Sequence, residues 1–283
     1  MTKSPKIGLA LGGGGARGLA HIPALEAFDE LGIEPAHISG TSIGAIIGAA
    51  YAAGMSGADI RAHTVDMLAD RGRALGQLMK LRPKRFKDLF EPGAFSLLQF
   101  DPEKVLNIFL PERIGNDFSS LRIPLSVIAT DYYGWREVEL SSGPLRRAVA
   151  ASIALPTIFR PVQIDGQVLM DGGMVNPLPL DKVAACDIVV AIDVVGGPEQ
   201  REGRTLPRAM DAVFGASQIL MKSIIAEKLR HDRADILLTP QINQFKVLDF
   251  LKTTTVLSAA EPLKDELKRA LDTALTAWRK KNP

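Results

Sequence analysis

The 283-residue sequence contains a single cysteine, few aromatic residues and no long uninterrupted hydrophobic run. Cys186 cannot form an internal disulfide, so we expect a buried apolar side chain and, by default, a cytoplasmic location. The longest run of small apolar residues, Ile43–Gly54, has 12 residues and contains glycines, whereas a membrane-spanning helix needs ~20. The sequence therefore predicts no transmembrane helix.

The sequence also has no large excess of charge of one sign. Its net charge is +2, which excludes the strongly basic surface typical of nucleic-acid-binding proteins. The apolar run Ile7–Leu11 follows two lysines, but it is too short for a signal peptide and continues directly into a glycine-rich loop. With 46% hydrophobic residues, the chain is long enough for a single α/β domain over residues 1–283.

What the sequence does contain is a GxSxG pentapeptide centred on Ser42. It lies between an apolar segment that ends near Ile38 and the helix-forming run Ala45–Ala53. A serine on a tight strand-to-helix turn is a nucleophile elbow, and Gly40 and Gly44 are required because a Cβ there would collide with the neighbouring strand and helix. The Ser42 hydroxyl at the helix N-terminus is suited to attack on an acyl carbon.

A second motif, the glycine-rich loop Gly12–Gly18, follows the predicted strand Ile7–Leu11 and precedes a helical pattern. Its backbone N–H groups can converge on a phosphate or on the oxyanion of a tetrahedral intermediate. A dinucleotide site needs an acidic residue at the end of the second strand, where this chain has Gly40–Ser42, and Glu34 precedes that strand in a turn. A P-loop is excluded because no Gly-Lys-Ser/Thr follows the glycines.

The general base for Ser42 is predicted to be an aspartate. None of the four histidines, at positions 21, 37, 63 and 231, occupies the last place of a Ser, Asp, His order. Asp171 ends an apolar run and opens a glycine turn, so it is the preferred candidate. Asp165 and Asp193 are the other carboxylates at loop edges, and Asp193 is the stronger competitor because it also ends an apolar run.

These motifs together resemble the patatin-like phospholipase family. That family combines, in this order, a glycine-rich oxyanion loop, a GxSxG nucleophile and an Asp-Gly-Gly base, which match Gly13–Gly18, Gly40–Gly44 and Asp171–Gly173. The similarity covers about residues 6–195. Two features depart from the pattern: the glycine run has no preceding acidic residue, and Pro23 falls in the first predicted helix, where it should bend the helix or mark its true start.

The resemblance implies a role for each motif residue. Ser42 is the nucleophile and Asp171 the base of a dyad, with a pKa that burial should raise. The oxyanion hole is implied at the backbone N–H groups of Gly13, Gly14 and Gly15. Supporting positions are Arg17, Gly18, Gly40, Gly44, Gly172 and Gly173. Arg17 is expected to anchor the loop, with binding of a lipid phosphate as the alternative.

The periodicity predicts a three-layer α/β fold with a largely parallel central sheet. Strands are expected near 7–11, 36–39, 123–129, 162–170 and 187–194, and late helices over Leu206–Arg230 and Ala259–Lys280. Residues 54–117 form a predicted lid or substrate-access insertion. Within it, Arg71–Lys87 combines basic and apolar residues without an acid, so it is a candidate for peripheral contact with an anionic membrane at the inner face, with an ordinary solvated surface as the alternative.

The functional prediction is a serine acyl hydrolase that cleaves fatty-acyl esters of phospholipids or lysophospholipids through an acyl-enzyme. It needs no metal and no cofactor. An acyl-CoA thioesterase or a general carboxylesterase is the enzymatic alternative, because the motifs define chemistry and leave chain length and leaving group open. A regulatory lipid-binding protein with negligible turnover is the alternative outside enzymes. The sequence makes no prediction of the oligomeric state.

Overall fold

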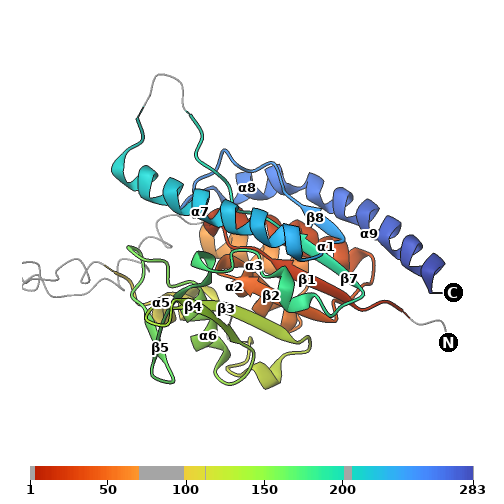
Figure 1. Ribbon diagram of the computed structural model, residues 1–283, viewed down its shortest axis with the longest axis horizontal. Helices are drawn as coiled ribbons and strands as arrows, with labels where there is room; N and C mark the ends of the chain where they lie inside the picture. The colour runs from red at the N-terminus through yellow and green to blue at the C-terminus, as the bar shows by residue number, and fades with distance from the viewer. Residues whose placement is uncertain (1–3, 70–98, 112, 201–205, 283) are drawn as a thin grey trace, which may run out of the picture.

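The structure is a computed structural model that describes residues 4–69, 99–111, 113–200 and 206–282. Its centre is an eight-stranded sheet with helices on both faces (Figure 1). The strands are β1 (Ile7–Leu11), β2 (His37–Thr41), β3 (Leu125–Asp131), β4 (Arg136–Leu140), β5 (Val162–Ile164), β6 (Gln167–Asp171), β7 (Ile188–Ile192) and β8 (Ile236–Leu238). The helices are α1 (His21–Glu30), α2 (Ile43–Ala52), α3 (Gly57–Ala69), α5 (Pro102–Phe109), α6 (Leu145–Ser152), α7 (Ala209–His231), α8 (Thr253–Ala260) and α9 (Pro262–Lys281).

The central strands β3, β2, β1, β7 and β8 run parallel in that spatial order. β1 and β7 are buried along their whole length, as expected for parallel strands covered on both faces. On one face the larger core packs against α1, α2, α6 and α9, and on the other a smaller core packs against α7. The predicted three-layer, largely parallel fold is confirmed, with β4, β5 and β6 as an antiparallel addition.

The register of β3 explains how the GxSxG motif and the Asp-Gly-Gly motif come together. β4 pairs with β3 from Val127 to Asp131, so it occupies one side of β3 over that stretch. On the other side, β2 pairs with β3 up to Thr41 opposite Ile128, and β6 takes over with Asp171 opposite Ala129. The carboxyl ends of β2 and β6 therefore meet head to head along one edge of β3. Ser42 follows Thr41 directly, so it emerges beside Asp171.

Several predicted boundaries need correction. The single strand expected over 162–170 is a hairpin, because Asp165 and Gly166 both adopt positive φ and turn the chain. The last expected helix is preceded by a separate α8. Pro23 lies in the first turn of α1, where a missing N–H costs no helical hydrogen bond, so it marks the true start of that helix. Cys186 is only half-buried.

The described part of the predicted insertion, residues 54–117, contains α3 and α5. The segment Arg71–Lys87, for which membrane contact was predicted, lies outside the described residues. The structure instead identifies α7 as one helix that is long and apolar enough to cross a membrane by length and composition, although only 17% of its most apolar window is buried. The sequence contains no uninterrupted apolar run at α7, because Ser217, Gln218 and Lys222 lie within it, and the prediction therefore did not include this helix.

Candidate active site

Ser42 has the strained backbone of a nucleophile elbow. Its φ of 55° and ψ of −122° are unusual for a residue with a side chain. Both flanking glycines are sterically required: a Cβ on Gly40 would lie 2.6 Å from the carbonyl oxygen of Gly44, and one on Gly44 would lie 2.1 Å from the carbonyl oxygen of Leu11. The turn fixes the Ser42 hydroxyl at the start of α2, above the end of β2.

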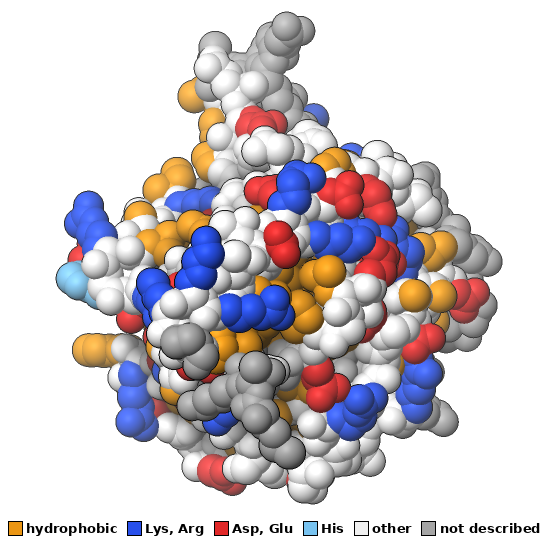
Figure 2. Space-filling model, turned by 90° about the vertical axis from the view of Figure 1, so that its right-hand side faces the viewer, with side chains coloured by type: hydrophobic (Ala, Val, Ile, Leu, Met, Phe, Trp, Pro, Cys, Tyr) orange, Lys and Arg blue, Asp and Glu red, His pale blue; other side chains and the backbone are white. Residues whose placement is uncertain are grey.

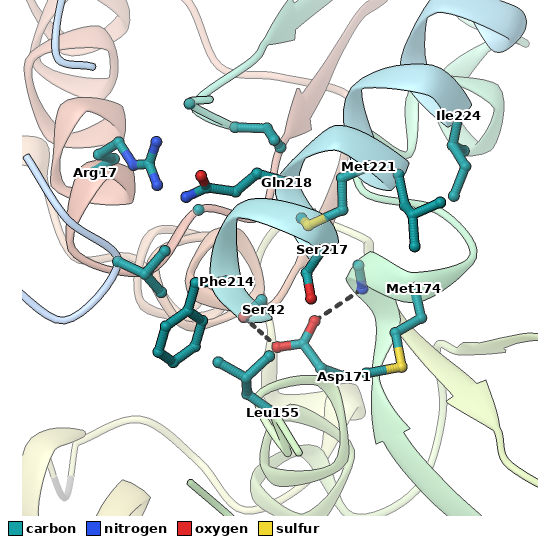
Figure 3. A pocket seen from close by; sticks show the side chains of 17 residues that line it. Arg17, Ser42, Leu155, Asp171, Met174, Phe214, Ser217, Gln218, Met221 and Ile224 are labelled. Carbon is teal, nitrogen blue, oxygen red and sulfur yellow. Dashed lines mark hydrogen bonds between the residues drawn. The ribbon is translucent and has the colours of Figure 1, made fainter. Parts of the chain in front are cut away.

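Asp171 accepts the hydrogen bond of the Ser42 hydroxyl. Ser42 Oγ lies 2.7 Å from Asp171 Oδ2, and the other carboxylate oxygen, Oδ1, accepts the backbone N–H of Gly173 at 2.8 Å (Figure 3). The Asp171 backbone is also fixed, because its carbonyl accepts the Thr130 hydroxyl and its N–H donates to the carbonyl of Ala154. The carboxylate is therefore held in one orientation toward the serine.

Burial raises the pKa of Asp171 to about 6, because the apolar surroundings disfavour the charged form. The hydrogen bonds from Ser42 and Gly173 oppose this shift. The result is a carboxylate that is ionised at neutral pH and yet basic enough to accept a proton, which suits a general base. The sequence predicted that burial would raise the pKa of Asp171, and the structure agrees.

The glycine loop differs in one detail from the predicted oxyanion hole. The N–H of Gly13 donates to the carbonyl of Pro177 at 2.9 Å, so it is already engaged. Gly14 and Gly15 line the cavity beside Ser42, and within the described residues their N–H groups have no hydrogen-bond partner. Of the three amides predicted to form the oxyanion hole, those of Gly14 and Gly15 are therefore the ones that are not already engaged in the described structure. A Cβ on either glycine would also collide with backbone, at Val194 and Val247 respectively.

Arg17 is buried, with 1% of its surface exposed, and it lines the same cavity. In the described part of the chain its Nε and Nη1 atoms have no hydrogen-bond partner. Burial lowers the pKa of Arg17, and the charges of Asp193, Glu199 and Asp249 oppose that shift. Figure 3 shows the guanidinium directed toward Gln218 of α7. Among the described residues, Nε and Nη1 therefore make no bond to the loop carbonyls, which the expected anchoring role would require.

None of the competing titratable residues contacts the pair in the described structure. His21 is fully buried and shares a hydrogen bond of 2.8 Å with the carbonyl of Gly12, and burial lowers its pKa to about 4. His37 bonds to the hydroxyl of Ser126, and His231 is exposed beside Glu227. The sequence did not predict that His21 holds the glycine loop. Its position in the first helix, six residues after Gly15, could have indicated that it lies close to the loop.

The alternative aspartates are also accounted for. Asp193 lies at the end of β7 and accepts from Lys222 at 2.6 Å and from the N–H of Val195 at 2.9 Å. Asp165 is exposed in the β5–β6 turn. Neither hydrogen-bonds to Ser42, so the choice of Asp171 over both is consistent with the geometry.

The cavity beside Ser42 has a volume of about 310 Å³ and a mostly apolar lining. α7 supplies much of that lining through Phe214, Leu220, Met221 and Ile224, and Leu155 closes the opposite side (Figure 3). Sequence reasoning missed these residues, although the uncharged stretch Ala212–Met221 was a readable signal. Within the described ranges no cluster of three or more His, Cys, Asp or Glu side chains is arranged to hold a metal ion.

The fold and this site are those of an α/β protein with a serine on a strained strand-to-helix elbow beside a buried aspartate. A family model for patatin-like phospholipases matches residues 9–184. The chain therefore belongs to the patatin-like phospholipase family, whose members are classed as hydrolases acting on ester bonds.

Individual relatives agree with this assignment. An uncharacterized NTE family protein of Mycobacterium tuberculosis is 34% identical over 198 residues, which cover 69% of this chain and 51% of that protein. Patatin-like phospholipase domain-containing protein 7 of Rattus norvegicus is 37% identical over 194 residues, covering 66% of this chain and 13% of the rat protein. The match thus spans about half of the mycobacterial relative and a smaller part of the rat one. VipD from Legionella pneumophila shares the fold, with a TM-score of 0.52, 15% identity and coverage of 95% of this chain and 67% of that one.

Proposed function

We propose that the protein hydrolyses fatty-acyl ester bonds of phospholipids or lysophospholipids, with Ser42 as nucleophile and Asp171 as general base. The observation that carries this proposal is the 2.7 Å hydrogen bond from Ser42 Oγ to Asp171 Oδ2 at the wall of an apolar cavity. We further propose a cytoplasmic protein that acts at the membrane surface, where such lipids are found.

The reaction follows from the positions of these groups. Asp171 accepts the proton of Ser42 as Oγ attacks the ester carbonyl carbon, and the amides of Gly14 and Gly15 stabilise the negative oxygen. The tetrahedral intermediate expels the alcohol, which takes the proton from Asp171, and leaves an acyl group on Ser42. Asp171 then deprotonates a water molecule that attacks the acyl carbon. The second tetrahedral intermediate expels Ser42 Oγ, which takes this proton back from Asp171, so the fatty acid is released and the Ser42 hydroxyl is restored.

Two features of the cavity fit a phospholipid. The apolar lining from α7 fits an acyl chain, since it offers few polar partners to a hydrophilic substrate. Arg17, at the same cavity, offers free guanidinium donors to a phosphate. Thioesterase or carboxylesterase activity with the same dyad remains the second candidate, because Ser42 and Asp171 act identically on any acyl carbon.

The test is a panel of substrates given to the purified protein and to a Ser42→Ala control. Phosphatidylcholine, lysophosphatidylcholine, an acyl-CoA and a p-nitrophenyl ester are compared by kcat/KM. We expect the phospholipids to be cleaved with release of free fatty acid, and no activity from the control. Preference for the acyl-CoA would favour the thioesterase, and no turnover of any substrate would favour a lipid-binding role.

A further inference from the structure

The two halves of α7 differ in how far they are buried. Its second half packs on the sheet, where Ile225 joins the core formed with Ala10 and Ala191, and Lys228 pairs with Asp181. Of its first twelve residues only Gly215 is buried. Met221 lies against Gly173 beside the dyad, so the residues before it extend past the carboxyl ends of the strands. Figure 1 shows this first half at the left, away from the two chain termini on the right. It spans ~18 Å.

The projecting half of α7 exposes hydrophobic side chains to solvent. Met210 is 50% exposed, Val213 48% and Leu220 65%. These three positions, with Ser217 and Ile224, are spaced at three and four residues and so form one stripe along the helix. Leu220 and Ile224 also line the catalytic cavity. The stripe is therefore continuous with the wall of the site.

The serine hydroxyls on this part of the helix are satisfied internally. No charged residue occurs from Ala212 to Met221. The Ser217 hydroxyl donates to the carbonyl of Val213 at 3.1 Å, and the Ser223 hydroxyl donates to that of Ile219 at 3.0 Å. Back-bonded serines are tolerated in an apolar medium because they leave no donor unpaired. The stripe can thus leave water without breaking a hydrogen bond of these hydroxyls.

A second apolar feature lies at the same end of the sheet. The β3–β4 turn exposes Tyr132, Tyr133 and Trp135, the last by 88%. Since β3 runs parallel to β2, this turn follows the same strand ends as Ser42. Trp135 adopts a φ of 54°, unusual for a bulky residue, and its N–H donates to the carbonyl of Asp131. Exposed tyrosine and tryptophan are the side chains favoured at a membrane–water boundary.

The exposed hydrophobic side chains are concentrated at this end. Among the described residues, Met210, Val213, Ile219 and Leu220 lie on α7, Tyr132, Tyr133 and Trp135 lie on the β3–β4 turn, and Met174 lines the cavity, whereas Leu31, Leu206, Leu237, Leu248 and Leu251 lie elsewhere. The opposite end of the molecule, which faces the viewer in Figure 2, carries basic and acidic side chains interspersed around an area of hydrophobic ones.

We propose that the stripe on the first half of α7, together with the aromatic β3–β4 turn, docks into the acyl region of a lipid membrane. This inference rests on the proposed function, because it names the surface from which the substrate comes. Both features lie at the carboxyl ends of the parallel strands, where Ser42 also lies, and Met221 of α7 contacts Gly173 next to Asp171. An acyl chain then passes from the membrane along Leu220 and Ile224 to Ser42 without crossing water.

Binding is tested apart from catalysis, with Ser42→Ala protein and phosphatidylcholine vesicles. In this background we compare Met210→Gln/Val213→Gln, Trp135→Asn and the control Leu31→Gln. Leu31 is 41% exposed at the opposite end of the sheet, and asparagine tolerates the positive φ of position 135. We expect the α7 double variant to lose at least ~10-fold in partitioning and Trp135→Asn to lose several-fold, with the control within about twofold of the parent. Salt at ~0.5 M should not abolish binding.

A second readout locates the contact. With Trp278→Phe, Trp135 is the remaining tryptophan, and its emission should shift to the blue on vesicle addition and be quenched by lipids brominated in the acyl chain. Equal binding by all variants, or binding lost in high salt, would overturn the proposal. The proposal would also be overturned if the parent protein is a dimer that does not bind vesicles and the α7 double variant is a monomer. When Ser42 is restored, the same variants should hydrolyse a soluble ester at the wild-type rate. If the wild-type protein itself does not hydrolyse this ester, that result would count against the proposed function and not against membrane docking.

Discussion

Ser42 Oγ donates a 2.7 Å hydrogen bond to Asp171 Oδ2, although 129 residues separate the two positions in the chain. The contact arises because β2 and β6 end head to head on the same side of β3. No histidine among the described residues intervenes. The relationship yields predictions on pH dependence, on stability and on the roles of neighbouring residues.

The pKa of Asp171 should set the acid limb of the pH–rate profile. Because its carboxylate must be ionised to accept the Ser42 proton, kcat/KM on a soluble p-nitrophenyl ester should rise as pH increases through about 6. Between pH 5 and pH 7 the increase should be ~10-fold, with a plateau above. A profile that is flat over this range, or one centred near the usual aspartate pKa, would contradict the role of a buried base.

Replacing the base should reduce activity and raise stability. Asp171→Asn should lower kcat by ~10²-fold or more. A folded-state pKa above the unfolded value means that the carboxyl group stabilises the fold below pH ~4 and that this contribution is lost as pH rises through about 6. The ionised group therefore costs up to about 3 kcal/mol at pH 8. Asp171→Asn should raise Tm at pH 8, and the gain should shrink toward pH 4.

Asp193→Asn is the matched control for that stability effect. Asp193 also ends a strand and is buried, but it is paired with Lys222 at 2.6 Å. Its loss leaves the ammonium group without its partner, so Tm at pH 8 should fall. A lower Tm for both variants would show that burial of the Asp171 charge is not the cause of the difference.

Much of this arrangement was predictable from sequence. The order of the glycine loop, Gly40–Gly44 and Asp171–Gly173 predicted the family and the dyad partners, because close backbone packing allows only glycine at those turns. The state of the Gly13 amide was not predictable, since its acceptor, Pro177, is distant in sequence. Nor was the place of α7 on the cavity, because a helix that is apolar on several sides does not reveal which side is covered.

The histidines should be dispensable for proton transfer. Replacing His37, His63 or His231 with alanine should leave kcat within about threefold, since His37 and His231 bond elsewhere and His63 lies on α3, away from the cavity lining. His21→Ala should lower kcat by loosening the glycine loop, because the ring is bonded to the carbonyl of Gly12. The midpoint of its pH–rate profile should nevertheless stay near 6. A shift of that midpoint in any histidine variant would indicate a triad.

Arg17 should discriminate between substrates. Arg17→Gln should lower kcat/KM for phosphatidylcholine by ~10-fold or more relative to a neutral p-nitrophenyl ester, because charge-assisted bonds to the phosphate are lost. Since Nε and Nη1 of the guanidinium are buried without a hydrogen-bond partner in the described structure, its removal should not lower Tm. An equal decrease for both substrates together with a lower Tm would assign Arg17 to the support of the loop.

The most direct test of the dyad is the rate and site of covalent labelling by a fluorophosphonate, measured by peptide mass spectrometry. We expect a single adduct on Ser42, none in Ser42→Ala, and labelling slower by ~10²-fold or more in Asp171→Asn, because the base no longer accepts the serine proton. The Asp193→Asn variant should label at the wild-type rate. An adduct on another residue, or an Asp171→Asn variant that labels as fast as the wild type, would contradict the Ser42–Asp171 mechanism.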